Sequence, residues 1–503
     1  METLSSLAYG FSVILQPALL VFIIFGVIFG VVIGALPGLG PSAGIAILLP
    51  LTYGMNPLTG IAMMTGIYYG AMYGGSITSI TINTPGDSAA VMTTLDGYPM
   101  AKKGQAGKAL GMAAIASITG GTIAIIIYTF FAPWLAGFAT RFGPPEYFGL
   151  MLLGLTAVGG LASGSANKTF LATVFGLFLA TVGLDGITGN QRFTFGMLEL
   201  YEGLNFVPIA MGLFGIAEIM SLDQSDVSIK VQKQELSFKK QLPTKEEAKI
   251  CAPHIARSTA LGFFIGMLPG AGGTIATFLA YGLAKKTSKR GEKFGTGVIE
   301  GIAAPEAANN AASIGAMVPL ITLGVPGSAS TSIMLGALMM FGLRPGPLIF
   351  QTNPDFAWGL TASMYASNVI LVIIAMTALP LIVRILGVKK PILNSVVIAF
   401  ILVGAYCLNF RMFDVGITIL FGILGFVFKK IEFPVAPIIL ALVLGNMVEI
   451  NLRRSLIMFR GDILGIFTRP IAAVFFTLAI IALLLPLIRL ITDKINKPRV
   501  NES

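Results

Sequence analysis

The chain has 503 residues, of which 55% are hydrophobic and 11% are charged, whereas soluble domains carry about 25% charged residues. No soluble fold could bury that much apolar surface, so the composition predicts an all-α polytopic membrane protein. The net charge of +10 comes from Lys and Arg in short loops, as the positive-inside rule requires, and does not indicate nucleic-acid binding. The cysteines Cys251 and Cys407 and the single His254 do not support a disulfide framework, a thiolate metal site or a His-based triad.

Apolar segments run from Ala8 to Ile491 and predict roughly ten to twelve crossings, some of them broken. The first segment follows a start without basic residues and is too long for a signal peptide, so we expect it to stay in the membrane.

Two glycine-rich signatures each occur twice. The first, GVVIGALPGLG at 30–40, returns as GFFIGMLPGAG at 262–272. The second, TPGDSA at 84–89, returns as VPGSAS at 325–330, in the same order after a short insertion. Such duplication is typical of secondary transporters. It predicts a first transmembrane half at 1–220 and a second at 254–503. A polar, cytoplasmic linker at 221–253 would join them and could carry an amphipathic helix at the membrane interface.

The duplicated signatures break the predicted helices. Backbone N–H and C=O groups freed in hydrocarbon cost several kcal/mol each unless something satisfies them. Four breaks in repeat register therefore favour a site where half-helix N-termini bind an anion and freed carbonyls bind a cation. The alternative is that these residues only kink or pack the helices. The breaks comprise Pro37, Gly38, Gly40, Pro85, Gly86, Pro269, Gly270, Gly272, Pro326 and Gly327.

Charge patterning predicts that the two halves have opposite orientations. The stretch 257–284 is basic at both ends and is broken after an arm of 12 residues, 257–268. That arm reaches about 18 Å, short of a ~30 Å hydrocarbon core, so we expect a re-entrant hairpin with cytoplasmic ends. The equivalent exit at 53–57 has no Lys or Arg and is predicted to be periplasmic. The second signature shows the reverse bias, which indicates an inverted repeat. The basic residues at 494–499 predict a cytoplasmic tail.

Small polar residues follow each break and suit a carboxylate or a hydrated cation, although Ser and Thr also cap helices. The candidate substrate-binding residues are Ser42, Asn83, Thr84, Ser88, Thr274, Thr277, Ser328 and Ser330. Asp87 begins a half-helix where its copy has Ser328, which suits a cation or proton ligand as well as an interfacial N-cap.

The polar cluster at 300–313 supplies the other candidate cation ligands. Pro305 is predicted as the first residue of a helix, which would place Glu306 and Asn310 one turn apart with Asn309 beside them. A buried carboxylate with two amides can hold Na⁺ or shuttle a proton; the alternative is a first-turn Glu exposed among headgroups. Six charged residues near predicted span ends are interpreted as interfacial: Arg192, Glu199, Glu202, Arg411, Asp414 and Glu449.

The strings GALPGLG (34–40), INTPGD (82–87), PEAANNA (305–311) and LGVPGS (323–328) resemble those of the large membrane subunit of tripartite tricarboxylate transporters, the TctA family. The resemblance covers nearly the whole chain. It implies a multi-pass carrier of the bacterial inner membrane that works with a small membrane subunit and a periplasmic solute-binding protein. It also implies import of citrate or another di- or tricarboxylate, driven by Na⁺ or H⁺, without a cofactor. By analogy with other hairpin carriers, the movement would be of elevator type.

Two rivals remain at this point. One is a carrier for another organic anion that needs no binding protein, and the oligomeric state is left open for either carrier. The other is an integral membrane enzyme, which the absence of paired acidic motifs for Mg²⁺, zinc-ligand spacing and a Ser/His set disfavours. A channel is disfavoured because hairpins that fill the midplane suit occlusion better than an open pore.

Overall fold

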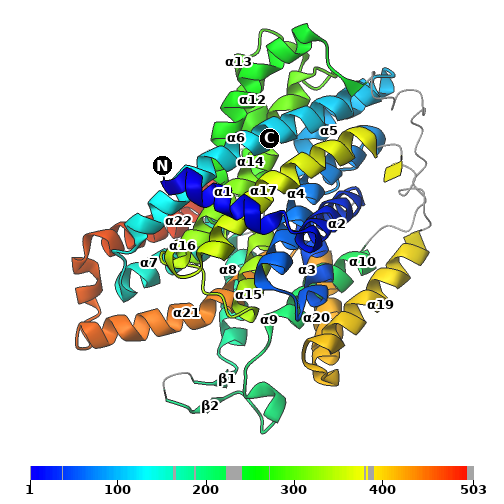
Figure 1. Ribbon diagram of the computed structural model, residues 1–503. Coiled ribbons are helices and arrows are strands. Elements are labelled where there is room, and N and C mark those ends of the chain that lie inside the picture. Colours follow the sequence, from blue (N-terminus) through cyan, green and yellow to red (C-terminus); the bar gives the residue numbers. More distant parts are fainter. Residues whose placement is uncertain are drawn as a thin grey trace, which may run out of the picture. The chain divides into compact units, whose positions relative to one another are not determined.

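The computed structural model describes residues 2–36, 38–161, 166–185, 188–221, 241–270, 272–378, 381–382 and 390–495. The chain forms two compact units, Met1–Thr140 with Asn205–Ile431 (unit 1) and Arg141–Leu204 with Glu432–Ser503 (unit 2). Each unit takes residues from both predicted halves. Helices dominate both units, and the strands among the described residues are the short antiparallel pair β1 (Gly183–Leu184) and β2 (Gln191–Arg192) (Figure 1).

Proline and small polar residues set many helix starts in the first part of unit 1. Pro57 is the first residue of α4, and the Asn56 side chain accepts a hydrogen bond from the Leu58 N–H at 3.0 Å, as N-cap residues do. The helices of this part are α1 (Glu2–Ile14), α2 (Pro17–Gly34), α3 (Gly40–Leu48), η1 (Leu49–Thr52), α4 (Pro57–Ile82), η2 (Ser88–Ala90), α5 (Val91–Lys102) and α6 (Ala106–Ala139).

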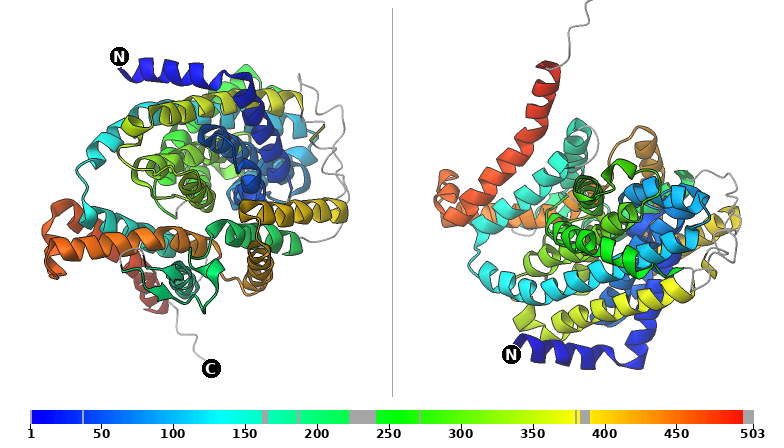
Figure 2. Two further views of the ribbon diagram at one scale, coloured as in Figure 1. Left: turned by 60° about the horizontal axis from the view of Figure 1, so that its bottom comes forward. Right: turned by 90° about the horizontal axis from the view of Figure 1, so that it is seen from above.

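The second part of unit 1 repeats this order of broken helices and adds others around it. Its helices are α9 (Phe206–Ala210), η4 (Met211–Ile216), α10 (Ala217–Ser221), α12 (Lys245–Gly266), α13 (Gly272–Thr287), η6 (Gly291–Lys293), α14 (Glu300–Leu323), α15 (Ala329–Met340), α16 (Ile349–Thr352), α17 (Pro354–Thr377), α19 (Lys390–Asn409) and α20 (Met412–Lys430). The N-terminal helix α1 packs along α17, as both views of Figure 2 show.

Unit 2 consists of two helix pairs and the β1–β2 hairpin. Its helices are α7 (Pro144–Leu161), α8 (Ala166–Ala180), η3 (Leu198–Leu200), α21 (Ala436–Met458), η7 (Leu464–Thr468) and α22 (Pro470–Ile495). Helix α8 packs on α21, and α7 packs on both α22 and α21. A Cβ atom at Gly176 of α8 would lie 2.3 Å from the Ile438 carbonyl oxygen, so glycine permits this close approach.

The glycines of the first signature bring two helix pairs into backbone contact. Added Cβ atoms at Gly30 and Gly34 of α2 would lie 2.4 and 2.2 Å from carbonyl oxygens of α4. Their copies Gly262 and Gly266 of α12 have the same relation to α14, at 2.4 and 2.2 Å. Glycines spaced by four residues therefore let α2 pack on α4 and α12 pack on α14 in the same way.

Two boundaries differ from the sequence-based predictions. Helix α12 begins at Lys245, so the arm before the break has 22 residues and not 12. A capping box starts it: Thr244 Oγ1 accepts from the Glu247 N–H at 3.2 Å, and Glu247 accepts from the Thr244 N–H at 2.8 Å. Helix α14 begins at Glu300, so Pro305 lies inside the helix and is not its first residue.

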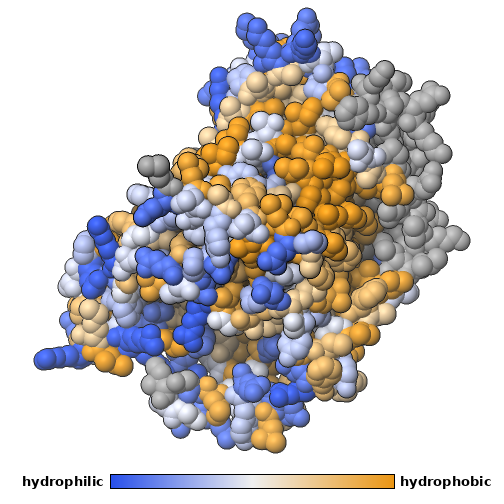
Figure 3. Space-filling model, in the orientation of Figure 1, coloured by the Kyte–Doolittle hydropathy of each residue, from blue (hydrophilic) through white to orange (hydrophobic). Residues whose placement is uncertain are grey.

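By length and composition, five helices of the described residues can cross a membrane, namely α2, α6, α17, α20 and α21. This number is lower than the ten to twelve crossings expected, because many apolar helices here are short or carry polar residues. Figure 3 shows a broad apolar area on one face, with hydrophilic residues beyond it where α13 ends. Most of the predicted linker (222–240) and the chain after residue 495 lie outside the described residues.

Candidate functional site

The two first-signature breaks have the same backbone geometry. Gly38 and Gly40 join α2 to α3 with φ angles of +88° and +49°, and Gly270 and Gly272 join α12 to α13 with +78° and +55°. Glycine adopts such angles at the lowest steric cost. Pro37 lies outside the described residues, and Pro269 is partly buried. Each copy thus forms a hairpin of two helices whose tip is a glycine turn.

Each hairpin tip is bonded through its main chain to the second break of the same copy. The Gly38 N–H donates to the Gly86 carbonyl oxygen at 3.0 Å, and the Gly270 N–H donates to the Gly327 carbonyl oxygen at 3.1 Å. Both hydrogen bonds place the Pro-Gly pairs, Pro85-Gly86 and Pro326-Gly327, directly against a hairpin tip. The duplication visible in the sequence is therefore a duplication of hydrogen bonds as well.

The second breaks also begin alike. Helix α4 ends at Asn83, which has a left-handed φ of +58°, and α14 ends at Gly324 with +70°. The next N–H groups, of Thr84 and Val325, return to the carbonyl oxygens of residues 78 and 319 at 3.4 and 3.1 Å, as in Schellman-type helix ends. The helix-end carbonyls are partly satisfied in this way.

Polar side chains connect the two copies at the breaks. Ser88 Oγ and Thr274 Oγ1 lie 2.7 Å apart, which joins the second break of the first copy to the hairpin of the second. Tyr68 Oη and Ser328 Oγ lie 3.2 Å apart, which joins α4 to the second break of the other copy. Helix α3 likewise contacts α15. All four breaks therefore gather around the crossing of α4 and α14.

Asp87 and Ser328 occupy equivalent N-cap positions. Asp87 Oδ1 accepts from the Ala90 N–H at 3.0 Å, and Ser328 forms a capping box with Thr331. This confirms the expected start of a half-helix at both residues. Asp87 as a whole residue is only partly buried.

Glu306 is fully buried and is surrounded by hydroxyl groups. Ser76 Oγ of α4 donates to Oε1 at 2.5 Å, Thr93 Oγ1 of α5 donates to the same oxygen, and Ser117 Oγ of α6 donates to Oε2 at 3.2 Å. Three helices of the first copy thus meet a carboxylate of the second. The alternative of a first-turn Glu exposed to headgroups is wrong, because Glu306 lies in the second turn of α14 and is inaccessible to solvent.

The two amides beside Glu306 point to different neighbours. Asn309 donates to the Met72 carbonyl oxygen at 3.3 Å, and its buried Oδ1 has no hydrogen-bond partner among the described residues. That oxygen faces the second hairpin, since a Cβ atom at Gly273 would lie 3.0 Å from it. Asn310 instead donates to the carbonyl oxygen of Glu306 in its own helix at 3.2 Å.

The remaining candidates lie around the breaks with weaker or more local contacts. Thr277 Oγ1 donates to the Thr274 carbonyl oxygen at 2.9 Å, and Thr84 Oγ1 donates to that of residue 82 at 3.3 Å. Ser42 is partly buried near the start of α3, Ser330 is buried in the first turn of α15, and Asn83 is exposed. No Lys or Arg is buried anywhere in the described part of the chain.

The model of the tripartite tricarboxylate transporter TctA family matches residues 20–440. The chain belongs to this family. A protein of Agrobacterium vitis, described as an uncharacterized 52.8 kDa protein in the TAR-I ttuC' 3'region, is 42% identical over 505 residues, covering 100% of both chains. A second protein from the TAR-II ttuC' 3'region of the same organism is 38% identical over 242 residues, 48% of this chain and 100% of that one. No solved structure matches.

TctA is a family of transporters, so the chain is a multi-pass membrane component of a tricarboxylate transporter. This agrees with the predicted carrier class. The motifs that carry the resemblance are the residues that form the breaks and the Glu306 environment described above.

The sequence did not reveal several polar residues of this TctA-family chain. Tyr68, Ser76, Thr93 and Ser117 contact the site but come from three consecutive helices of the first copy, and the last three lie 189 to 230 residues away from Glu306. The available signal was the recurrence of hydroxyl residues every three to four positions along α4. In unit 2, the predicted interfacial residues Arg192 and Glu449 form a network with Asp185 and Arg453, at N–O distances from 2.6 to 3.6 Å.

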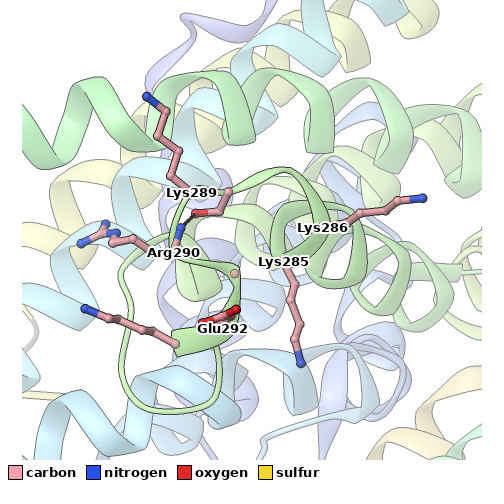
Figure 4. A pocket seen from close by; sticks show the side chains of 8 residues that line it. Lys285, Lys286, Lys289, Arg290 and Glu292 are labelled. Carbon is pink, nitrogen blue, oxygen red and sulfur yellow. Dashed lines mark hydrogen bonds between the residues drawn. The ribbon is translucent and has the colours of Figure 1, made fainter.

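A basic pocket lies at the far end of α13 and is lined by 285–286 and 288–293. Figure 4 shows that Lys285, Lys286, Lys289 and Arg290 point away from one another. Arg290 is bonded to Glu300 at 2.5 Å. Because the basic side chains do not converge, this pocket does not form a carboxylate site.

Proposed function

We propose that this chain imports di- or tricarboxylates such as citrate across the bacterial inner membrane, driven by an ion gradient, with Na⁺ as the main coupling ion. It would work with a periplasmic solute-binding protein and a small membrane subunit. The observation that carries this proposal is the meeting of four helix breaks, two from each copy, around α4 and α14. Membership in the TctA family supports the substrate class.

The anion would bind where half-helix starts and hydroxyls meet. Helix α15 and the η2–α5 segment begin at the second breaks, so their N–H groups and positive dipole ends lie beside the hairpin tips. Ser88, Thr274 and Ser328 add hydroxyl donors there. These groups can bind carboxylates without a buried Lys or Arg.

The cation would bind at the second hairpin. The Asn309 Oδ1 atom is buried, accepts no hydrogen bond from any residue that the structure describes, and faces Gly273. Carbonyl oxygens at helix breaks are the usual additional Na⁺ ligands. Asp87 would contribute a charge from the neighbouring second break.

Electrostatic repulsion gives a reason why transport of the anion would be coupled to transport of a cation. Asp87 and Glu306 place negative charge beside the anion site, and within the described ranges no buried Lys or Arg offsets it. At an effective dielectric of 20, two like unit charges about 6 Å apart repel by about 3 kcal/mol. A carboxylate therefore binds well only when cations enter with it.

The two copies would have opposite orientations in the bilayer, with both ends of the α12–α13 hairpin cytoplasmic. Their hydrogen-bond patterns support a common ancestry of the copies, and the basic residues around α13 support its orientation. An elevator movement of the hairpins is the analogous mechanism.

Uptake of labelled citrate into proteoliposomes that contain the chain, the small subunit and the binding protein tests the proposal. We expect uptake to need a Na⁺ gradient and the binding protein. Flux that ignores both Na⁺ and pH gradients would reject ion coupling, and uptake by the chain alone would favour a carrier without a binding protein.

Two variants of Asp87 separate a cation ligand from a helix cap. Asp87→Ser restores the residue of the other copy and keeps an N-cap, whereas Asp87→Asn keeps the shape and removes the charge. If Asp87 binds the cation, both variants raise the Na⁺ concentration for half-maximal uptake at least tenfold. If it only caps the helix, both transport as wild type does.

A further inference from the structure

The glycine contacts of the first signature show which residues of α4 and α14 are equivalent. Added Cβ atoms on two glycines of α2 would meet the carbonyl oxygens of Ile67 and Ala71 in α4, and those on their copies in α12 would meet the carbonyl oxygens of Ala308 and Ala312 in α14. The members of each pair are 241 residues apart, which is also the offset between the N-cap residues of the two second breaks. One offset therefore relates the two copies from the middle of α4 to the second break.

This offset shows that the two acidic candidates belong to one second break. It pairs Asp87 with Ser328, and it pairs Glu306 with Thr65. Glu306 accepts a hydrogen bond from Thr93 of α5, the helix that follows the second break of the first copy. Its counterpart Thr65 is uncharged and donates to a carbonyl oxygen of its own helix at 2.9 Å. Both carboxylates therefore lie at the second break of the first copy, and the second copy has hydroxyl residues at the equivalent positions.

The same offset pairs Tyr68 with Asn309, and each of these two residues reaches a second break of the other copy. The Tyr68 hydroxyl lies 3.2 Å from Ser328 Oγ, at the second break of the second copy. Asn309 Oδ1 lies beside Gly273, where an added Cβ atom would be 3.0 Å from Oδ1 and 3.3 Å from the Cβ atom of Ala89, at the second break of the first copy. The site thus consists of an acidic half (Asp87, Glu306 and Asn309) and a hydroxyl half (Tyr68, Ser328 and Thr331).

The two halves differ in what they offer to an ion. An ionised carboxylate only accepts hydrogen bonds. The Asn309 amide donates to the Met72 carbonyl oxygen, which leaves its buried oxygen without a donor among the described residues. The acidic half thus presents acceptors, which suit a cation. Tyr68, Ser328 and Thr331 each carry a hydroxyl hydrogen, so the hydroxyl half presents donors, which suit a carboxylate.

Tyr68 can turn its hydroxyl to a bound anion without disrupting the start of α15. Ser328 and Thr331 complete a capping box by themselves, because the Ser328 N–H donates to Thr331 Oγ1 at 2.8 Å and the Thr331 N–H donates to Ser328 Oγ at 3.3 Å. The Tyr68 hydroxyl is outside this box, and Ser328 Oγ is its one hydrogen-bond partner among the described residues. Tyr68 is fully buried, whereas Ser328 is partly exposed. An anion that reaches Ser328 therefore meets a buried donor that exchanges a neutral hydrogen bond for a stronger, charge-assisted one.

We propose that Tyr68 is a substrate-binding residue, whose hydroxyl donates to one carboxylate group of the substrate in the hydroxyl half, while the coupling cation occupies the acidic half. Ser88 and Thr274 remain to bind the other carboxylate groups. The duplicated site thus uses the second break of one copy for the anion and that of the other copy for the cation. This inference rests on the proposed function and assigns each ion to one half of the site.

Exchange of citrate in proteoliposomes that contain the complete transporter measures the affinity of the membrane site. Labelled citrate and the binding protein are outside, Na⁺ is saturating on both sides, and the concentration of unlabelled citrate inside is varied. Tyr68→Phe removes only the hydroxyl and should raise the internal citrate concentration for half-maximal exchange about tenfold, with a maximal rate within about twofold of wild type. Tyr73→Phe is the matched control, because the Tyr73 hydroxyl is also buried in α4 but has no hydrogen-bond partner among the described residues. This control should behave as wild type does.

A second variant removes the charge difference between the two second breaks. Ser328→Asp places the cap residue of the first copy in the second, so it keeps an N-cap and adds a negative charge beside the proposed carboxylate. It should raise the citrate concentration for half-maximal exchange by roughly a hundredfold or more. Thermal unfolding in detergent shows whether each variant is folded.

The possible results separate the two proposals. An unchanged half-maximal citrate concentration in Tyr68→Phe, whether or not its maximal rate falls, would overturn the role of Tyr68, as would an equal change in Tyr73→Phe. Exchange by Ser328→Asp at the wild-type citrate concentration would overturn the placement of the carboxylate. In each case citrate uptake by wild type leaves the proposed function standing, whereas absence of wild-type uptake under every gradient would overturn the proposed function itself.

Discussion

Replacing Gly86 by Ala tests whether the contact between hairpin tip and second break is as close as the structure shows. An added Cβ atom would lie 2.1 Å from the Gly34 carbonyl oxygen and 2.4 Å from the Gly75 Cα atom. Both are main-chain atoms, so no side-chain rotation relieves the clash. To reach the 3.4 Å of an ordinary contact, one backbone would have to move by about 1.3 Å. We expect a cost of about 3 kcal/mol, the upper part of the usual range for overpacking.

Thermal unfolding of the purified protein in detergent measures this cost. Two other glycines provide graded controls. At Gly327, the equivalent position, the nearest atom would lie at 2.8 Å, so Gly327→Ala should cost less. At Gly282 of α13 nothing lies within 4 Å, so Ala should be neutral or stabilise by up to about 1 kcal/mol. Unfolding temperatures for Gly86→Ala equal to those of Gly282→Ala would refute the close approach.

Three further predictions concern hydrogen bonds and charges. A double-mutant cycle of Ser88→Ala and Thr274→Ala should give a coupling of about 1 kcal/mol in citrate affinity, and strict additivity would contradict the bridge. Asp185→Asn should lower the stability of unit 2 by about 2 kcal/mol in chemical denaturation, because two guanidinium groups lose their shared carboxylate. Burial raises the pKa of Glu247, but the Thr244 N–H and the Lys108 ammonium lower it, and the net pKa is below its ordinary value. Wild type should therefore be more stable than Glu247→Gln above about pH 4.3, the unfolded value. This advantage should disappear as the pH falls through the lower folded pKa, and a pH-independent difference would contradict it.

The local chemistry of the breaks could be predicted from the sequence, because it depends on single residue types. Gly38, Gly40, Gly270 and Gly272 adopt left-handed angles that favour glycine, and their spacing repeats in both copies. The charge on Asp87 likewise marked the start of a half-helix.

Features that depend on tertiary contacts could not be predicted in this way. Pro305 was expected to begin a helix, but the loop before it is held by Asp96 of α5, whose Oδ1 accepts N–H groups of Gly295, Gly297 and Val298 at 2.8 to 2.9 Å. With the loop fixed there, α14 begins at Glu300. The hydroxyl partners of Glu306 could not be predicted from the sequence either, because they also depend on contacts between helices.

The length of α12 was underestimated for a different reason. Its first turns are polar, so a prediction based on apolar length alone placed the start of the arm at residue 257. The pattern Thr244-x-x-Glu247 was present in the sequence and marks the true start. The predicted halves at 1–220 and 254–503 remain predictions, since the compact units combine residues from both.

The main-chain bonds from Gly38 to Gly86 and from Gly270 to Gly327 affect how a cargo could enter. Within a copy, the tip cannot lift away without breaking the main-chain hydrogen bond that joins it to the second break. Between the copies, by contrast, the polar contacts near the tips come from hydroxyl groups and one side-chain amide. Water can replace each of these groups as a hydrogen-bond partner. We therefore expect a carboxylate to enter between the two copies rather than beneath a hairpin that opens by itself.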